Sequence, residues 1–278
     1  MNYYDNKQVL LATMHGKEKA ISNIFLKNLN CEVCVESFDT DQFGTFTGEK
    51  PRLLNPYETC LLKAKKAIEL YGYELSLASE GSFGPHPAIP FIPAGHEIMV
   101  FYDKKNNWII SEQLISEKTN FNMVTIDSQT ELKSFLTKIG FPNHAVTLQT
   151  NTTKEVIAKG IKDLSSLSSA LKKGFQKENQ LYLATDMRAM MNPTRMGVIR
   201  ELAHKLTLKI ASFCPECKAP GFGYANTQGH LNYKVCDSPT SFFRDEVWKC
   251  IQCDYKEIKP RKDGLQLVEP QYCNYCNP

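Results

Sequence analysis

Apolar residues along the first 210 positions of the chain follow two alternating patterns. Spacings of three and four predict helices at residues 17–29, 55–72, 128–140, 154–175 and from 192 onward. Short apolar runs predict strands at Val9–Ala12, Glu32–Ser37, Leu75–Ala78, 97–102, 108–111, Met123–Asp127, Ala145–Leu148 and Leu181–Ala184. Strands that alternate with helices predict an α/β fold in which a mixed sheet is flanked by helices in three layers.

The helix expected at residues 55–72 has the clearest local signals. Asn55 is a favourable N-cap, Pro56 suits the first helical position, and Glu58 can complete a capping box. Gly72 is a favourable C-terminal residue. The lysines of this helix are expected to be mostly solvated, with one of them able to reach a phosphate: Lys63, Lys65 and Lys66.

From residue 214 the pattern changes to closely spaced cysteines. Three CxxC pairs and one further cysteine occur there: Cys214 and Cys217, Cys250 and Cys253, Cys273 and Cys276, and Cys236. Each CxxC pair holds two thiolates within reach of one tetrahedral Zn²⁺, and two pairs complete a structural site. The sequence therefore predicts one or two structural zinc ions, in a zinc-ribbon-like domain at residues 211–278 that follows an α/β domain at 1–210.

The simplest assignment joins the first two CxxC pairs in one site and gives the third pair to a second site. Cys236 would then be the third ligand of the second site, and His230 the best available fourth. Tyr233 stands three residues before Cys236, where another CxxC pair would have its first cysteine. A site that joins the first CxxC pair to the last is an open alternative.

Composition and charge narrow the classes of partner. The 278 residues are 42% hydrophobic and 23% charged, with a net charge of +3, which is too small to imply a nucleic-acid partner. Residues 214–278 contain eight basic and eight acidic side chains, which argues against strong binding to a phosphate backbone. Neither a membrane-spanning run nor a signal-peptide pattern is present, so we expect a cytoplasmic protein without a membrane partner. Its oligomeric state is not indicated.

Polar side chains follow several of the predicted strands. Glu80 follows the strand Leu75–Ala78 and enters a turn rich in glycine and proline that also contains Ser82 and His86. Strands of open α/β sheets form sites in this way at their carboxyl ends. The alternative is an ordinary tight loop in which Glu80 is solvated.

Two further segments suit a phosphate. His15, Gly16 and Lys17 join a strand to a helix start, where free N–H groups and the lysine favour an anion. Arg188 and Arg195 flank the helix start at Asn192 and make a candidate oxyanion clamp. The alternatives are a surface lysine in the first segment and a loop-bracing ion pair with Asp186 in the second.

The polar segment 38–52 is too long for a simple turn. Asp39 and Asp41 are oxygen ligands whose spacing suits one Mg²⁺, and Arg52 ends the segment. A solvated loop is the alternative. Together with Glu80 and Asp186, these aspartates are the candidate catalytic acids.

Several of these motifs together resemble an uncharacterised bacterial family that is known as a domain of unknown function. The motifs are HGKE at 15–18, DTDQFGTFTGE at 39–49, SEGSFGPHP at 79–87, DMRAMMNPTRM at 186–196 and the CxxC tail. The resemblance covers nearly the whole chain and implies no activity.

The first 110 residues also resemble the inosine triphosphate pyrophosphatase-like fold, which includes the Maf-like proteins. The motifs are ATMHGK at 12–17, KAKKA at 63–67 and LASEG at 77–81. This resemblance implies that Lys17 contacts phosphate and that Glu36 and Glu80 lie near Mg²⁺. It departs at His15-Gly16, where asparagine is usual, and at Gly81, which follows a single acid.

These observations predict a Mg²⁺-dependent phosphohydrolase that acts on a nucleotide or another phosphorylated small molecule. In that reading, the metal held by carboxylates neutralises phosphate charge and activates water. The alternatives are a non-catalytic nucleotide sensor and a module that binds RNA or protein through the ribbon.

Overall fold

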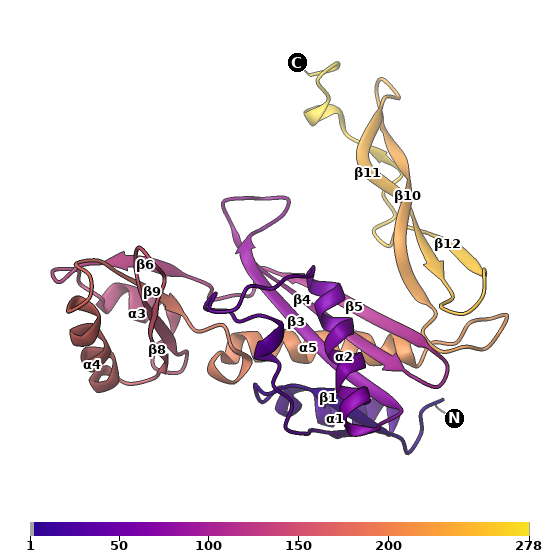
Figure 1. The fold of residues 1–278 in the computed structure, drawn as a ribbon. Coiled ribbons are helices and arrows are strands. Elements are labelled where there is room, and N and C mark those ends of the chain that lie inside the picture. The colour runs from indigo at the N-terminus through magenta and orange to yellow at the C-terminus, as the bar shows by residue number, and fades with distance from the viewer. Residues whose placement is uncertain (1–2, 278) are drawn as a thin grey trace. The chain divides into compact units, whose positions relative to one another are not determined.

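The computed structural model describes residues 3–277, in two compact units, Met1–Thr207 (unit 1) and Leu208–Pro278 (unit 2). Unit 1 contains two sheets flanked by helices, and unit 2 contains one sheet (Figure 1). The protein is therefore a mixed α/β fold with a cysteine-rich C-terminal unit, as the sequence predicts. In the described residues, no helix combines the length and apolar character needed to cross a bilayer.

The first sheet of unit 1 has the strand order β2-β1-β3-β4-β5. The pairings β1–β2 and β1–β3 are parallel, whereas β3–β4 and β4–β5 are antiparallel. The strands are β1 (Gln8–Ala12), β2 (Glu32–Cys34), β3 (Leu75–Pro85), β4 (Pro93–Asp103) and β5 (Trp108–Ser116). The last two form the hairpin that the apolar runs at 97–102 and 108–111 predict.

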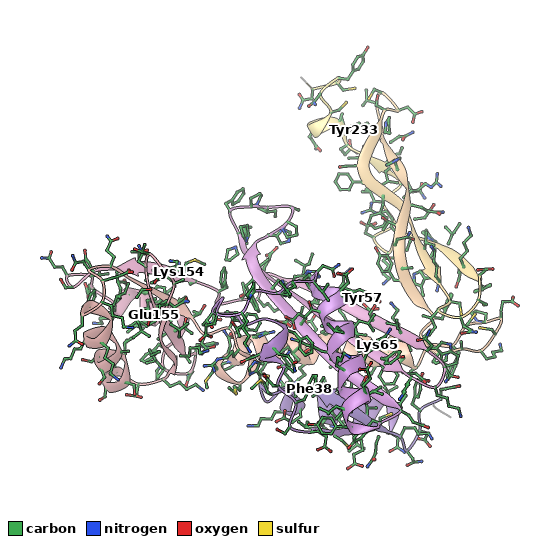
Figure 2. The ribbon with its side chains drawn as sticks, in the orientation of Figure 1. Phe38, Tyr57, Lys65, Lys154, Glu155 and Tyr233 are labelled. Atoms are coloured by element: carbon green, nitrogen blue, oxygen red, sulfur yellow. The ribbon has the colours of Figure 1, made fainter. Side chains whose placement is uncertain are left out.

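Helices cover both faces of this sheet. The helix α2 (Pro56–Tyr71) packs on one face through a buried cluster that includes Phe38 and Ala64. Figure 2 labels Phe38 beside this helix. On the other face, α1 (Glu18–Leu29) places Phe25 against Phe101 of β4, and α5 (Pro193–Ile210) hydrogen-bonds to α1. The first sheet with its helices therefore has three layers.

The start of α2 is formed by the predicted capping box. Glu58 donates its backbone N–H to the Asn55 side chain at 2.9 Å, and the Glu58 carboxylate accepts from the backbone N–H of Asn55. The expectation that Lys63 is solvated is wrong, because this side chain is only 6% exposed. Its place on the helix, three residues after Cys60 and beside Ala64, puts it on the apolar face.

The strand that carries Glu80 is longer than the sequence indicates. Glu80 lies inside β3, directly opposite Ile98 of β4, and the pairing continues to Pro85. The expected turn after Ala78 is therefore wrong. The pairing partner β4 explains the difference, since its backbone satisfies the N–H and C=O groups through a glycine-rich stretch that has low intrinsic strand propensity.

The second sheet of unit 1 has the order β6-β9-β7-β8 and is antiparallel throughout. Its strands are β6 (Met123–Ile126), β7 (Val146–Thr150), β8 (Val156–Ile161) and β9 (Leu181–Thr185). The helices α3 (Lys133–Ile139) and α4 (Leu164–Phe175) pack against it around a separate apolar cluster.

The predicted helix at 154–175 is wrong over its first part, where the chain forms β8. Gly160 has a positive φ of 71°, and Asp163 caps α4 by accepting a hydrogen bond from the backbone of Ser166 at 2.7 Å. Ile157 and Ile161 satisfy a helical spacing, but both lie on a strand instead, where Ile161 is buried and Ile157 is partly buried.

Unit 2 is built on a long hairpin. Its strand order is β12-β11-β10-β13. The strands are β10 (Gly223–Tyr233), β11 (Pro239–Lys249), β12 (Lys256–Pro260) and β13 (Leu267–Val268). The described residues also include three short 3₁₀ turns. Two lie in unit 1, η1 (Asp41–Phe43) and η2 (Ala189–Met191), and one lies in unit 2, η3 (Pro270–Tyr272).

Candidate functional site

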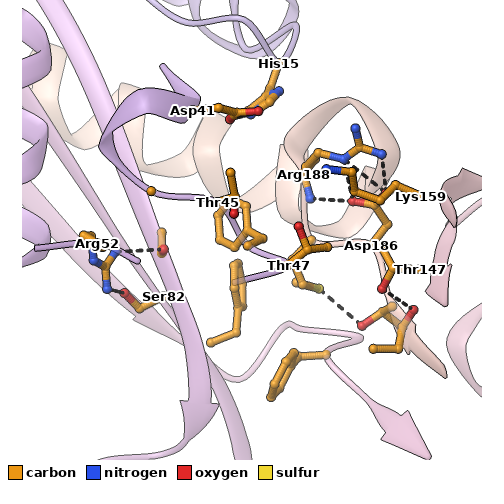
Figure 3. Close-up of a pocket in the computed structure, with 18 of the residues that line it drawn as sticks. His15, Asp41, Thr45, Thr47, Arg52, Ser82, Thr147, Lys159, Asp186 and Arg188 are labelled. Atoms are coloured by element: carbon orange, nitrogen blue, oxygen red, sulfur yellow. Dashed lines mark hydrogen bonds and ion pairs between the residues drawn. The ribbon is translucent and has the colours of Figure 1, made fainter. Parts of the chain in front are cut away.

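Unit 1 contains a pocket of about 400 Å³ that is lined from both of its sheets (Figure 3). The side chains of Arg52 and Ser82 lie on one side of it, and those of Asp186 and Arg188 lie on the other (Figure 3). Of the residues singled out in the sequence, the pocket brings together His15, Asp41, Arg52, Glu80, Ser82, Asp186 and Arg188. A pocket of this volume accommodates a small organic ligand.

Glu80 is held between two cations on the face of the sheet that α2 covers. Lys63 approaches one carboxylate oxygen at 2.6 Å, and Arg52 approaches the other at 3.3 Å. Burial raises the pKa of Glu80, but the Lys63 and Lys17 charges outweigh burial, so the pKa lies below its usual value. Glu80 is therefore an ionised carboxylate that positions Arg52, whose second nitrogen donates to Ser82 at 2.9 Å.

Lys17 does not stand at the pocket surface as the sequence suggests. Its amine is buried and donates to the carbonyl and hydroxyl oxygens of Ser79 at 2.8 and 2.9 Å. It lines a chamber of about 20 Å³ that also includes Lys63, Glu80 and Arg195. This volume is enough for about one water molecule.

The stability contribution of Lys17 is expected to depend on pH. Burial, followed by the Arg195 charge, lowers the pKa of Lys17 from 10.5 to about 8. Between these pH values the unfolded chain binds the proton more tightly, so the contribution of Lys17 to the free energy of unfolding rises with pH, by roughly 3 kcal/mol. Urea unfolding of the wild type and of Lys17→Met across this window measures the difference.

A matched control for this experiment is Lys65→Met. Lys65 lies on α2 and is only partly buried, with its amine 5.2 Å from the centre of the Tyr102 ring. This variant measures what the loss of a partly exposed lysine costs, and its result is compared with that of Lys17→Met at each pH. A difference between Lys17→Met and the wild type that stays flat with pH would contradict the lowered pKa of Lys17.

Arg195 is not available as a surface clamp, because it forms a buried ion pair with Glu97 of β4. Two of its nitrogens lie 2.6 and 3.2 Å from the carboxylate oxygens, and both side chains are 1% exposed. A third nitrogen donates to the carbonyl of Met187. Gly81 makes room for the pair, since a Cβ there would lie 2.5 Å from both Arg195 and Glu97.

Asp186 and Arg188 pair with each other beside the pocket. Two nitrogens of Arg188 lie 2.6 and 3.0 Å from the carboxylate of Asp186, which also accepts the backbone N–H of Gly160 at 3.0 Å. This is the bracing arrangement that the sequence left open. Arg188 nevertheless lines the pocket, so its guanidinium also faces a potential ligand.

His15 and Asp41 form a dyad at the edge of the pocket. The Nε2 atom of His15 lies 3.2 Å from the Asp41 carboxylate. Burial, followed by the Lys17 charge, lowers the pKa of His15, so its imidazole is neutral near pH 7. Its Nδ1 atom is the single buried side-chain nitrogen or oxygen without a hydrogen-bond partner in the described residues. The dyad has the composition of a general base and its orienting carboxylate.

The carboxylates of the pocket do not fit a resident Mg²⁺. Glu80 and Asp186 are occupied by cations, and Asp39 is exposed and accepts the backbone N–H of Asp41. In the described residues, two clusters bring three or more potential metal ligands close enough to bind one ion. Both consist of cysteines, and neither contains a carboxylate. Mg²⁺ prefers oxygen ligands in an octahedral arrangement, and the aspartates alone do not supply it.

Three other residues singled out in the sequence lie outside the pocket. Gly16 has a positive φ of 69° in the turn before α1, where a Cβ would be strained. The His86 ring accepts backbone N–H groups inside the β3–β4 connection. Glu36 accepts from the Tyr73 hydroxyl at 3.1 Å.

The sequence reasoning missed the aromatic wall of the pocket. The rings of Phe46 and Phe83 have centroids 5.9 Å apart, and those of Phe83 and Phe121 are 6.1 Å apart. Tyr182 also lines the pocket. These four residues come from four distant segments, so no local pattern signals them. The missed Lys63 and Glu97 did carry a signal, because each is a charge within an apolar helix face or strand.

Unit 2 contains two cysteine clusters. In the first, Cys214 lies 3.8 Å from Cys253, and Cys217 lies 3.5 Å from Cys250. A tetrahedron with metal–sulfur bonds of about 2.3 Å has edges of about 3.8 Å, so these positions suit a metal ion. The second cluster consists of Cys236, Cys273 and Cys276.

The expected fourth ligand of the second cluster, His230, does not join it. His230 lies on β10 opposite Phe243 of β11 and is outside the group of potential ligands. Both clusters can hold metal ions, the first with four thiolates and the second with three.

Residues 63–278 match a family model described as a domain of unknown function (DUF6671). The chain belongs to this family. The resemblance to an uncharacterised family is thereby confirmed, whereas the resemblance to the inosine triphosphate pyrophosphatase-like fold is not confirmed. The matched region begins within α2 and includes all of unit 2.

A solved structure, that of protein VC0702 from Vibrio cholerae, aligns with 73% of this chain and 93% of its own, at 10% identity and a TM-score of 0.33. A score of this size supports no statement about shared fold or function. No curated protein matches the chain.

Proposed function

We propose that the pocket of unit 1 binds a nucleotide, or another phosphorylated small molecule with a flat ring, and that the protein hydrolyses a phosphate bond of it. One observation carries the proposal. The same pocket presents two guanidinium groups, those of Arg52 and Arg188, and a wall of aromatic rings. A guanidinium group can donate two parallel hydrogen bonds to two oxygens of one phosphate, and aromatic rings stack on bases.

The two arginine ion pairs of the pocket and the His15–Asp41 dyad each have a role in this proposal. Glu80 and Asp186 hold Arg52 and Arg188 in place for the phosphates. With Nε2–H of the neutral His15 directed to Asp41, its Nδ1 atom is the one that accepts the proton of a water molecule that reaches it. The water oxygen forms a bond to phosphorus while the bond to the leaving oxygen breaks.

Metal ions enter the proposal in two ways. We propose that the four-thiolate cluster holds structural zinc and that the three-thiolate cluster also holds zinc, for which thiolates are preferred ligands. The carboxylates of the pocket fit no resident Mg²⁺, so Mg²⁺ would arrive bound to the phosphates of the ligand. The second candidate function is a non-catalytic nucleotide sensor, which is favoured by the complete pairing of Glu80 and Asp186.

Replacing Arg188 with methionine is expected to lower affinity for the phosphorylated ligand roughly 10–100-fold, the usual effect of losing a hydrogen bond between charged groups. His15→Gln is expected to lower turnover by about 10²–10⁴-fold while affinity changes little. Calorimetry with nucleosides and their mono-, di- and triphosphates, with and without Mg²⁺, measures affinity. Released phosphate and pyrophosphate measure turnover.

The matched control is Lys65→Met, which removes a cation of unit 1 outside the pocket. We expect this variant to behave as the wild type. Binding without turnover would favour the sensor. If no phosphorylated compound binds, or if Arg188→Met binds as tightly as the wild type, the proposal is wrong.

A further inference from the structure

The first CxxC turn of unit 2 has a defined backbone. The N–H of Cys214 donates to the carbonyl of Ala219 at 2.9 Å, and the N–H of Lys218 donates back to the carbonyl of Cys214 at 3.1 Å. Lys218 has a positive φ of 61°. This turn directs the sulfurs of Cys214 and Cys217 to one point, where Cys250 and Cys253 complete the cluster.

The turn that contains Cys236 repeats this backbone. The N–H of Tyr233 donates to the carbonyl of Ser238 at 2.9 Å, and the N–H of Asp237 donates back to the carbonyl of Tyr233 at 3.0 Å. Asp237 has a positive φ of 57°. In this correspondence Cys236 takes the place of Cys217.

Tyr233 therefore occupies the position of the first metal ligand in a turn built for two (Figure 2). Its phenol oxygen lies on the far side of an aromatic ring, well beyond the reach of a cysteine sulfur from the same position. The turn thus has the backbone of a CxxC metal-binding turn, but tyrosine stands where the first cysteine would be.

The third CxxC turn is anchored beside this one. β13 pairs with β10 in parallel, with Val268 opposite Tyr233, and Lys234 donates its N–H to the carbonyl of Val268 at 2.9 Å. The chain then leads to Cys273, whose sulfur lies 3.6 Å from that of Cys236. This spacing is close to the edge of a tetrahedral metal–thiolate site.

We propose that the second cluster is a three-thiolate metal site whose fourth coordination position is open to a nitrogen or sulfur donor from outside the chain, with water there otherwise. Within the described residues no further His, Cys, Asp or Glu joins the group. Cys236 and Cys276 are partly exposed, which gives a ligand access. A closed four-thiolate site is structural, whereas an open position permits ligand exchange.

Cobalt spectroscopy of the full chain tests this proposal. The metal-free protein is loaded with Co²⁺, whose visible bands report the number of thiolates and the nature of the fourth ligand. We expect two Co²⁺ per chain with different spectra. Imidazole is expected to shift the bands of one Co²⁺ and to leave those of the four-thiolate site unchanged.

Two substitutions at one position sharpen the test. Tyr233→Cys restores the missing ligand, so its second Co²⁺ is expected to show a four-thiolate spectrum that imidazole does not shift. Tyr233→Phe is the matched control and is expected to keep the wild-type spectrum and its response to imidazole.

Three outcomes would overturn the proposal. The first is a wild-type spectrum that imidazole does not change, which means that the coordination is already complete. The second is a changed spectrum in Tyr233→Phe, which means that the phenol is a ligand. The third is a single Co²⁺ per chain. If Tyr233→Cys does not fold, the response of the Co²⁺-loaded wild type to imidazole decides by itself whether the fourth position is open.

Discussion

Replacing Glu97 with glutamine is expected to lower the free energy of unfolding of unit 1 by about 3–5 kcal/mol. Glu97 and Arg195 are each 1% exposed, and they form the most deeply buried of the ion pairs described here. Glutamine keeps the shape of the side chain but removes its charge, so the guanidinium of Arg195 is left in the protein interior without a counter-charge.

Urea unfolding of the full chain measures this effect. The protein contains two tryptophans, and Trp248→Phe leaves Trp108 of β5 as a fluorescence reporter for unit 1. The control is Glu69→Gln, which breaks an exposed ion pair with Lys66 of the same 2.6 Å length and is expected to cost far less, because solvent screens exposed charges.

A second variant separates loss of charge from loss of packing. In Glu97→Leu with Arg195→Met, no unpaired charge remains, so most of the lost stability is expected to return. If Glu97→Gln lowers the free energy of unfolding no more than Glu69→Gln does, the buried pair contributes no more to stability than an exposed one. If the double variant is less stable than Glu97→Gln, the guanidinium contributes through its contact with Met187 as well.

Removal of metal from the cysteine clusters is expected to unfold unit 2 and to leave unit 1 folded. Structural zinc sites bind with about 10–16 kcal/mol of apparent free energy, which small domains use to fold. Unit 2 has few buried apolar side chains, among them Leu231 and Val247, so the metal has to supply stability that its core does not.

A chelator titration followed by Trp248 fluorescence in a Trp108→Phe chain measures this effect. Cys250→Ser is expected to reproduce it without chelator, because it removes a ligand of the four-thiolate cluster. Cys34→Ser is the control, since Cys34 is partly exposed on β2 and lies outside both clusters. An unchanged fluorescence signal after the metal has left would contradict a structural role.

The buried charges lie on both faces of the first sheet, and the strand register explains why. Glu80 of β3 pairs with Ile98, and its neighbour Gly81 pairs with Glu97. Because successive side chains of a strand point to opposite faces, Glu80 meets Lys63 of α2, whereas Glu97 meets Arg195 of α5. A register shift of one residue would separate both pairs.

Two ion pairs set the direction of the arginine side chains that line the pocket. Arg52 and Arg188 face the pocket because Glu80 and Asp186 hold their side chains in place. Lys17 adds a buried charge whose hydrogen bonds go to the neutral oxygens of Ser79. A bound anion near the chamber would stabilise the protonated amine.

The sequence by itself determined the features that depend on near neighbours. The capping box of Asn55 and Glu58 spans three positions, and the CxxC turns place their sulfurs through local backbone geometry. The β4–β5 hairpin follows from two apolar runs around a polar turn. In each case the interacting groups lie a few residues apart, so their spacing in the sequence carries the geometry.

Only the tertiary structure decided which charges are buried and which loops meet. Lys63 and Glu80 are separated by 17 positions, and Arg195 and Glu97 by 98. Their pairing depends on strand register and helix packing, which no local pattern encodes. The pocket likewise joins segments from two sheets, and the helical spacing of Ile157 and Ile161 was overridden by pairing in β8. At the buried ion pairs, the pocket and β8, contacts between distant segments contribute more to the free energy of folding than local propensity does.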